Sequence, residues 1–240
     1  VFAIFEDILL KIIFSLKKML KAVIFDMDGV IVDSEPIHHA AYQKTFNEFE
    51  IEVSPELYAS FTGKATLPIC EYICSSFNLK ISPEILVACK RKYFSQLFDQ
   101  DTSFKLLDGV LELIQEYHEK ALTLVLASSA SMININRIFK RFDLDSYFIS
   151  KHSGADLKAS KPHPEIFKNA AKASGFLPSE CIVIEDSTNG ITAAKAAGIY
   201  CVGYNSVHSK NQSYDGADLI ITNFSEISFD KITTFFNSKN

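Results

Sequence analysis

Two aspartates follow a short apolar run near the start of the sequence. The segment Lys21–Gly29 has the sequence KAVIFDMDG, so Asp26 and Asp28 stand where an apolar strand would end. Side chains alternate along an extended chain, and both carboxylates would therefore point the same way and repel each other unless a cation lay between them. Mg²⁺ binds such oxygen ligands. An ordinary turn is the alternative, because Asp and Gly also favour turns.

Three further polar motifs occur near the ends of other expected core elements: Ser128 with Ser129, Lys161 in the sequence SKPHP, and Glu185 with Asp186. Each motif has an ordinary explanation when it is taken alone. The serines could begin a helix, Lys161 could be a solvated surface residue, and Asp186 could be a helix N-cap. Their occurrence in this order, each near the end of a core element, favours a common site.

The elements that must position these residues are predicted from the apolar pattern. Five short runs are expected to be buried parallel strands: Ala22–Phe25, Leu122–Ala127, Ile182–Ile184, Tyr200–Gly203 and Leu219–Ile221. Each is almost continuously apolar, as expected where helices cover both faces of a sheet. Helical patterns separate most of them: Val110–Glu119, Met132–Phe142, Pro164–Ser174 and Gly190–Ala197. This alternation predicts an α/β fold with a doubly wound, Rossmann-like parallel sheet, whose ligands bind beyond the carboxyl ends of the strands.

The pattern changes between Asp33 and about Lys105, where only helical stretches occur: Pro36–Phe49, Pro55–Phe61, Leu67–Phe77 and Pro83–Gln100. About 70 residues are enough for a separate folding unit. We therefore predict an inserted α-helical cap over residues 34–104. The α/β core would then consist of residues 19–33 and 105–240.

Residues 1–18 are predicted to be an N-terminal extension outside the catalytic fold. The stretch is apolar, but Glu6, Asp7 and Lys11 interrupt it, so it is too short and too charged for a membrane span. It also lacks the arrangement of a signal peptide, with cations before the apolar run and a cleavage site after it. Met19 directly precedes the first strand, and we expect translation to begin there.

Charge and cysteine content narrow the class of protein. The chain has 240 residues and a formal net charge of −5, whereas nucleic-acid-binding proteins usually carry a basic face. Five cysteines, with no CxxC pair, favour neither a disulfide framework nor a zinc site. We expect a cytoplasmic monomer with reduced cysteines that binds neither nucleic acid nor a membrane.

With its four motifs in this order, the sequence resembles the haloacid dehalogenase superfamily. The similarity is to the subgroup with an α-helical cap, which includes β-phosphoglucomutase and small phosphosugar phosphatases. It extends over nearly the whole chain from Met19 onward and includes the segment Asp33–Pro36 that leads into the cap. The second aspartate, Asp28, favours phosphoryl transfer, because dehalogenases of the same fold attack carbon and typically lack it. The resemblance implies a small phosphorylated metabolite as the binding partner.

The resemblance also implies a role for each motif. Asp26 would be the nucleophile that becomes an aspartyl phosphate, and Asp28 would act first as an acid and then as a base. Ser128, together with Ser129 and nearby backbone N–H groups, would bind a phosphoryl oxygen. Lys161 would offset the negative charge of the phosphoryl group and the nucleophile.

Mg²⁺ is the cofactor that the resemblance implies. Its ligands would be the carboxylate of Asp26, the main-chain carbonyl of Asp28 and the carboxylate of Asp186. Glu185 would bind through water or hold the other ligands in place.

The substrate is predicted from the cap. By the resemblance, His38 would help to position Asp28, although a histidine on the helix surface is the alternative. Lys92 matches a cap lysine that binds substrate, although a basic run such as Lys90–Lys92 is usually only a solvated helix face. Thr66 stands where β-phosphoglucomutase has a phosphate-binding arginine, and threonine cannot replace the bidentate guanidinium. We therefore expect a phosphatase acting on a small sugar or polyol phosphate. A phosphosugar mutase and a non-catalytic phosphosugar-binding module are the alternatives.

Overall fold

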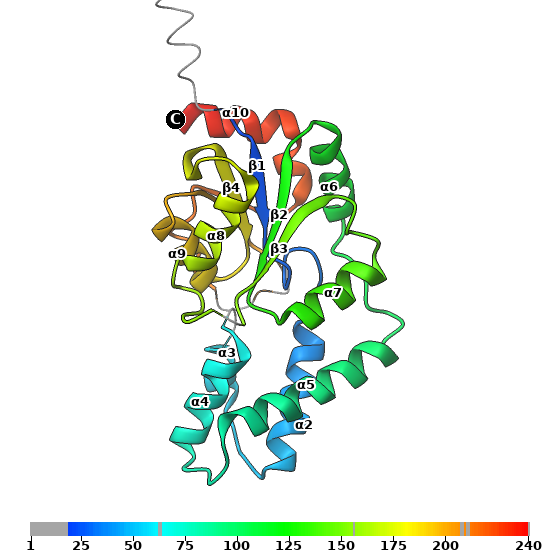
Figure 1. The fold of residues 1–240 in the computed structure, drawn as a ribbon, viewed down its shortest axis with the longest axis vertical. Coiled ribbons are helices and arrows are strands. Elements are labelled where there is room, and N and C mark those ends of the chain that lie inside the picture. Colours follow the sequence, from blue (N-terminus) through cyan, green and yellow to red (C-terminus); the bar gives the residue numbers. More distant parts are fainter. Residues whose placement is uncertain (1–18, 62–63, 156, 207–208, 210–211, 240) are drawn as a thin grey trace, which may run out of the picture.

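A six-stranded, wholly parallel sheet forms the centre of the computed structural model (Figure 1). The structure describes residues 19–61, 64–155, 157–206, 209 and 212–239, so the predicted extension over residues 1–18 lies outside the described residues. The strands lie in the sheet order β3-β2-β1-β4-β5-β6. In chain order they are β1 Ala22–Phe25, β2 Thr123–Ser128, β3 Phe148–Ser153, β4 Cys181–Glu185, β5 Tyr200–Tyr204 and β6 Leu219–Ile221. The predicted α/β fold with a doubly wound parallel sheet is confirmed.

One strand, β3, is absent from the sequence prediction. It is one of the two edge strands of the sheet, has the sequence FISKHS, and most of its residues are only partly buried. Ile149 on this strand is 61% exposed. Partly exposed positions can hold polar residues, so β3 lacks the continuous apolar run of the fully buried β1, whereas β6, the other edge strand, keeps an apolar run and is predicted.

The register of the central strands aligns their carboxyl ends. Phe25, the last residue of β1, pairs with Leu126 of β2 on one side and with Ile184 of β4 on the other. The residues that follow these three positions therefore lie together at the carboxyl ends of the strands, which we call the carboxyl edge of the sheet. In a parallel sheet this is the edge at which ligands bind.

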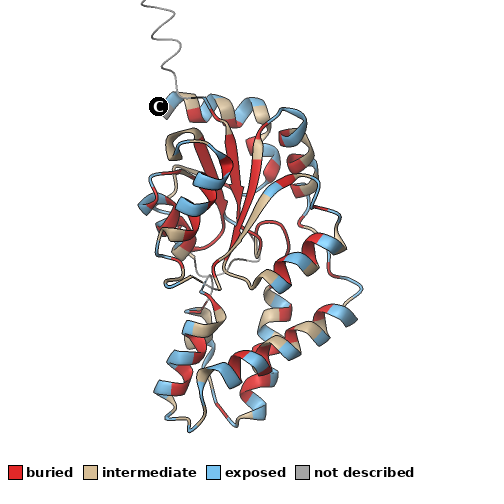
Figure 2. Ribbon diagram, in the orientation of Figure 1, coloured by how far each residue is buried: buried red, intermediate tan, exposed pale blue. Residues whose placement is uncertain are grey.

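Helices cover both faces of the sheet, as Figure 1 shows. Those of the core are α6 Val110–Glu119, α7 Met132–Arg141, α8 Glu165–Ser174, α9 Thr188–Ala196 and α10 Phe229–Lys239, with short 3₁₀ turns η1 Pro178–Glu180 and η2 Phe224–Ile227. Val23 and Phe25 of β1 pack on the side of α6 and α7, whereas Ala22 and Ile24 pack on the side of α8 and α9. This alternation produces a buried layer on each face of the sheet, and the central strands are coloured as buried in Figure 2.

Four helices lie beyond the carboxyl edge of the sheet, in the lower part of Figure 1: α2 Glu35–Glu48, α3 Pro55–Ala59, α4 Thr66–Ser76 and α5 Pro83–Gln100. We call these four helices the cap. They share a small apolar core of their own, in which Phe46, Ile73 and Leu86 are almost completely buried. The helix bounds match the predicted ones to within two residues. The exact limits of the cap, at residues 34 and 104, stay a prediction.

Two arginines of α7 join the core to the end of the cap. Arg141 donates hydrogen bonds to the carbonyl oxygens of Phe98, at 3.0 Å, and of Asp101, at 2.5 Å. Its guanidinium also lies over the Phe98 ring, 4.9 Å from the centroid. Arg137 donates to Ser95 Oγ at 2.6 Å. The Arg141 contacts satisfy carbonyl groups at the C-terminal end of α5, where a positive charge is favourable.

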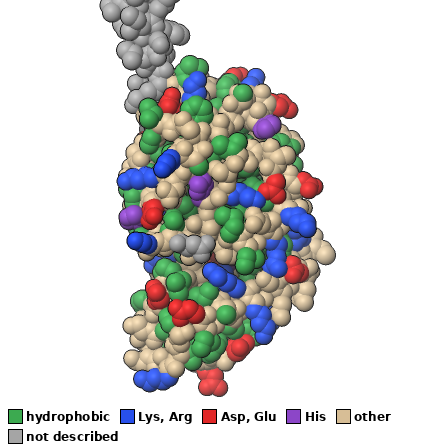
Figure 3. Space-filling model, in the orientation of Figure 1, with side chains coloured by type: hydrophobic (Ala, Val, Ile, Leu, Met, Phe, Trp, Pro, Cys, Tyr) green, Lys and Arg blue, Asp and Glu red, His purple; other side chains and the backbone are tan. Residues whose placement is uncertain are grey.

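The surface shows no charge segregation on the face in Figure 3, where the cationic and anionic side chains of the described residues are interspersed. All five cysteines are buried and free of disulfide bonds. Within the described part of the chain, no helix has the length and apolar character needed to cross a membrane.

Candidate active site

A cavity of about 610 Å³ lies between the carboxyl edge of the sheet and the cap. Its core side is lined by Asp26, Asp28, Ser129, Lys161, Glu185 and Asp186. Residues from four separate stretches of the sequence thus meet at one place: Asp26, Ser129 and Glu185 lie at the aligned ends of strands, and Lys161 lies in the loop before α8. The sequence analysis predicts each of them as a site residue.

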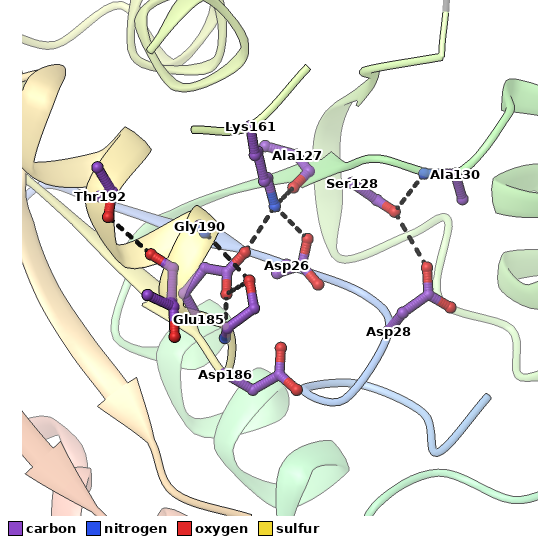
Figure 4. A network of polar contacts seen from close by, with 12 residues as sticks. Asp26, Asp28, Ala127, Ser128, Ala130, Lys161, Glu185, Asp186, Gly190 and Thr192 are labelled. Atoms are coloured by element: carbon purple, nitrogen blue, oxygen red, sulfur yellow. Dashed lines mark hydrogen bonds and ion pairs between the residues drawn. The ribbon is translucent and has the colours of Figure 1, made fainter. Parts of the chain in front are cut away.

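Lys161 lies between two carboxylates in the buried part of the site (Figure 4). Its Nζ donates to Asp26 Oδ1 at 2.5 Å, to Glu185 Oε1 at 2.8 Å and to the Ala127 carbonyl at 3.3 Å. Burial alone would lower the pKa of Lys161, but the charges and hydrogen bonds of Asp26 and Glu185 outweigh it and raise that pKa. Lys161 is therefore a permanent cation, and the alternative of a solvated surface lysine is wrong.

Three carboxylates surround a space suited to a cation. Oxygen atoms of Asp26, Glu185 and Asp186 all lie within 4.8 Å of one another, and all three residues are buried. Burial raises the pKa of Asp26 to about 8, against the opposing effect of Lys161. Burial and the charges of Glu185 and Asp26 likewise raise the pKa of Asp186. The single lysine leaves negative charge uncompensated, and the all-oxygen donor set fits a hard divalent cation such as Mg²⁺.

Two glycines make room for these acids. A Cβ on Gly29, whose φ is +85°, would lie 2.0 Å from Asp186 Oδ2. A Cβ on Gly190 would lie 1.7 Å from Glu185 Oε1. Glu185 is held further by Ser187, whose N–H and hydroxyl donate to Oε2 at 2.7 and 3.0 Å. The carboxylates are therefore fixed in place by backbone as well as by charge.

The N-cap of α9 is Ser187, which accepts a hydrogen bond from the Gly190 N–H at 3.1 Å. The alternative explanation of Asp186 as the N-cap is therefore wrong. Asp186 instead accepts a hydrogen bond from Ser209 Oγ, and its main-chain carbonyl accepts one from the Tyr214 hydroxyl at 3.0 Å. The sequence analysis did not identify Ser209, which lies in a loop without an apolar pattern.

Asp28 has a different set of partners. Ser34 Oγ donates to Asp28 Oδ1, His38 Nε2 lies 3.5 Å from the same oxygen, and Ser128 Oγ lies 3.4 Å from Oδ2. Burial acts to raise the pKa of Asp28, but hydrogen bonds from His38 and Ser34 and the charge of Lys90 outweigh it, so that this pKa is lowered. Asp28 is thus a carboxylate in the substrate-free protein.

The structure brings His38 to Asp28, as the sequence analysis expected, but places a different lysine beside it. Lys90 Nζ lies 2.7 Å from His38 Nδ1, and Lys90 is only 2% exposed. Lys92, the lysine expected to bind substrate, is exposed and lies outside the cavity, 5.6 Å from the Tyr93 ring centroid. Residues two apart on a helix point in nearly opposite directions, so only one of the pair can face the cavity.

A sequence signal for Lys90 exists in the spacing of α5. Leu86, Lys90, Phe94 and Phe98 recur every four residues, and all are buried. A lysine in register with an apolar stripe is buried with it, and it needs a polar partner. In this fold that partner is His38.

The predicted phosphate-binding serines lie at the end of β2. Ser128 is fully buried, accepts a hydrogen bond from the Ala130 N–H at 3.0 Å and faces Asp28, whereas Ser129 lines the cavity. Thr66 lines the cap side of the cavity.

Comparisons with known proteins agree with this geometry. The family model described as haloacid dehalogenase-like hydrolase matches residues 23–204. A phosphorylated carbohydrates phosphatase of Thermotoga maritima is 31% identical over 84% of this chain and 90% of its own length. A β-phosphoglucomutase of Bacillus subtilis is 28% identical over 88% of this chain and 93% of its own length.

A solved structure shows the same fold. The crystal structure of β-phosphoglucomutase from Clostridium difficile has a TM-score of 0.82 at 26% identity, and the match covers 92% of this chain and 99% of that one. The family match includes Asp26, Lys161 and Asp186, which line the cavity. These findings confirm the resemblance seen in the sequence, and the chain belongs to the haloacid dehalogenase-like hydrolases.

Proposed function

We propose that this protein is a Mg²⁺-dependent phosphatase that hydrolyses a small phosphorylated sugar or polyol through an aspartyl phosphate on Asp26. One observation carries the proposal: a single cavity holds two carboxylates with different partners. Asp26 is paired with a buried cation, Lys161, whereas Asp28 is held by the hydroxyl of Ser34 and the imidazole of His38. Two carboxylates in different environments can take different roles in one reaction.

In the first step, Asp26 attacks the phosphorus atom of the substrate. Its Oδ1 accepts the hydrogen bond from Lys161, and no described residue donates to Oδ2, which is left to form the new bond. The bond between phosphorus and the leaving-group oxygen breaks, and protonated Asp28 gives its proton to that oxygen. The dianionic substrate favours this protonation, because its charge raises the pKa of a neighbouring carboxylate.

In the second step, Asp28 acts as a base. Its carboxylate accepts a proton from a water molecule, whose oxygen attacks phosphorus while the bond between phosphorus and Asp26 breaks. Inorganic phosphate leaves and the Asp26 carboxylate is regenerated. The hydrogen bonds that Ser34 and His38 supply stabilise the ionised form of Asp28 that this step requires.

The carboxylates of Asp26 and Asp186 and the main-chain carbonyl of Asp28 would hold Mg²⁺, and the clustered carboxylate of Glu185 would bind it through water or support the other ligands. When it is bound, the ion neutralises negative charge on the phosphoryl oxygens and on the attacking carboxylate. Lys161 contributes a second positive charge at Oδ1 of Asp26. Without such charges, a carboxylate approaching a dianion would meet strong repulsion in a site from which water is excluded.

Hydrolysis is favoured over mutase chemistry by the cap. A mutase must grip a second phosphate, and among the described residues that line the cavity there is no arginine to do so. The carbohydrate phosphatase relative, at 31% identity, supports the same choice. A β-phosphoglucomutase-type activity is the second candidate, because the fold and length of that enzyme from C. difficile match this chain closely.

The test is a phosphate-release assay on a panel of sugar and polyol phosphates with Mg²⁺. Release of inorganic phosphate supports the phosphatase. Interconversion of β-glucose 1-phosphate and glucose 6-phosphate without release would support the mutase. Binding of the panel compounds with neither outcome would contradict both enzymes and leave a phosphosugar-binding module. Mass spectrometry of the peptide that contains Asp26 after acid quenching of a turnover mixture tests the intermediate.

A further inference from the structure

Among the described residues that line the cavity, the cap contributes one acidic side chain, Glu35, in addition to the carboxylates of the core side. Glu35 is the first residue of α2 and lies three residues before His38, so the two share one face of the helix. Its Oε1 accepts a hydrogen bond from the Tyr58 hydroxyl at 3.0 Å. No described residue donates to Oε2. A half-buried carboxylate therefore offers an acceptor to the cavity.

Tyr58 keeps this carboxylate in place. Its ring packs edge-on against His39, with centroids 4.8 Å apart, and lies 5.9 Å from Tyr42 and 6.2 Å from Phe61. These contacts fix the ring, and with it the hydroxyl that donates to Glu35. Tyr42, Tyr58 and Phe61 also line the cavity. Their rings present apolar surface directly beside the carboxylate.

Among the described residues, no lysine or arginine forms an ion pair with Glu35, although the charge of Lys90 acts on it from a distance. Lys90 contacts His38, and Lys64 is exposed to solvent. Burial raises the pKa of Glu35, against the opposing effects of the His38 charge, the Tyr58 hydrogen bond and the Lys90 charge. A second phosphate placed beside Glu35 would meet a like charge, whereas a hydroxyl group would meet a charged acceptor.

We propose that Glu35 is a specificity-determining residue that accepts hydrogen bonds from hydroxyl groups of the leaving group, with Tyr58 as its positioning residue. The substrate class is then a phosphate monoester of a neutral, polyhydroxylated alcohol that carries a single phosphate. The aromatic walls cover the carbon-bound hydrogens of that alcohol, and the carboxylate disfavours bisphosphates. This inference rests on the proposed phosphatase function and identifies its substrate class.

The experiment compares three kinds of substrate. The first kind is a monophosphate that bears hydroxyl groups, represented by glucitol 6-phosphate and glucose 6-phosphate. The second is p-nitrophenyl phosphate, an ester whose leaving group has no aliphatic hydroxyls. The third is a bisphosphate, glucose 1,6-bisphosphate. The readouts are two ratios of kcat/KM: the better monophosphate over p-nitrophenyl phosphate, and the same monophosphate over the bisphosphate. Because both are ratios, a general loss of folded or active protein cancels.

The wild-type protein should prefer the monophosphate in both ratios. Glu35→Gln keeps the shape of the side chain but removes its charge, and it should lower the first ratio about 10-fold and also lower the second. Tyr58→Phe leaves the ring in place and should lower the first ratio about 5-fold, because the carboxylate loses its anchoring hydrogen bond. Glu71→Gln, an exposed cap glutamate outside the cavity, is the matched control and should keep both wild-type ratios.

Two results would overturn the inference. One is a Glu35→Gln variant whose ratios stay within about twofold of the wild type, and the other is a wild-type preference for the bisphosphate. Both outcomes are distinct from failure of the proposed function, in which the wild type would release phosphate from none of the substrates.

Discussion

Lys90 Nζ lies 2.7 Å from Nδ1 of His38, and Nε2 of the same imidazole lies 3.5 Å from Asp28 Oδ1. A buried lysine of the last cap helix thus reaches the proposed acid and base through one histidine. Burial lowers the pKa of Lys90 to about 8, although the charge of Asp28 opposes the shift. Its ammonium also lies near the rings of Tyr42 and Phe94, 4.9 and 5.0 Å from their centroids.

Lys90→Met should stabilise the protein at neutral pH and lower its activity. The pKa of Lys90 is about 8 in the folded protein, below its ordinary value of 10.5, so the folded protein binds this proton more weakly than the unfolded chain does. Its burial therefore costs stability in full below pH 8, and this cost is relieved as the pH rises from about 8 to 10.5. We expect a gain of about 1–3 kcal/mol at pH 7 that disappears by about pH 10, measured by denaturant unfolding.

The control for this experiment is Lys92→Met, two residues along the same helix but exposed. It should change neither the stability nor kcat by more than a small amount. A Lys92→Met variant as inactive as Lys90→Met would contradict the assignment of the two lysines.

Asp26→Asn should abolish phosphate release while the fold is kept, because an amide cannot serve as the nucleophile. We expect a loss of at least about 1,000-fold in kcat. The exposed Asp230→Asn is the control and should retain full activity. Circular dichroism and thermal unfolding check the fold, and an Asp26→Asn variant near wild-type activity would refute the proposed nucleophile.

Lys161→Ala should weaken both the substrate affinity and the stability. The substitution leaves Asp26 and Glu185 buried without the ammonium that links them, which costs about 3–5 kcal/mol when a buried ion pair is broken. Unfolding in denaturant measures the stability, and phosphate release measures turnover. Lys158→Ala, an exposed lysine nearby in the sequence, should behave as the wild type. Equal effects of the two substitutions would argue against the role of Lys161.

Removal of divalent cations should stop turnover, and addition of Mg²⁺ should raise the melting temperature. An ion at 100 times its Kd stabilises the folded state by about 2.7 kcal/mol. Asp186→Asn removes one of the three clustered carboxylates and should weaken this Mg²⁺-dependent shift. Scanning fluorimetry across a Mg²⁺ titration is the measurement, and a shift in Asp186→Asn equal to that of the wild type would exclude this residue as a ligand.

Gly29→Ala should disturb the metal-binding carboxylate, and a second glycine provides the matched comparison. Gly29 and Gly175 have nearly the same positive φ, +85° and +82°, so an alanine is strained to a similar degree at both. Only at Gly29 would the new Cβ meet Asp186, because nothing lies within 4 Å of a Cβ at Gly175. Gly29→Ala should therefore lose Mg²⁺ affinity and activity, whereas Gly175→Ala should lose only stability. Similar Mg²⁺ affinities for the two variants would contradict this.

The elements predicted from the sequence are those in which buried positions, and therefore apolar residues, follow a continuous or regularly spaced pattern along the chain. β1 is predicted at its observed bounds because all four residues are buried and apolar. The helix α10 is not predicted, although Ile232 and Phe236, four residues apart, are buried against the sheet and could have indicated it. The edge strand β3 gives no such signal, because solvent covers much of its surface.

The site residues also fall into a group that could be predicted from the sequence and a group that could not. Asp26 and Glu185 follow or end strands whose carboxyl ends the register aligns, so their meeting could be expected from the order of the elements. Ser34 and Ser209 contact the carboxylates from loops, where no periodic pattern indicates a direction. Glu35 depends on Tyr58, a partner 23 residues away on another helix, which only the folded cap brings near.

Two segments connect the cap to the core, one before α2 and one after α5, and they make different contacts with the core. Arg141 of the core helix α7 binds the end of the cap at Phe98 and Asp101, which do not line the cavity, whereas Ser34, at the entrance, donates a hydrogen bond to Asp28. A rotation of the cap that keeps the Arg141 contacts would have its axis at the end of α5. It would therefore move the other connection, the segment that contains Ser34. Such a rotation would change the hydrogen bond from Ser34 to Asp28, and with it proton transfer by Asp28. The ion pairs of Lys161 lie wholly within the core and would not change.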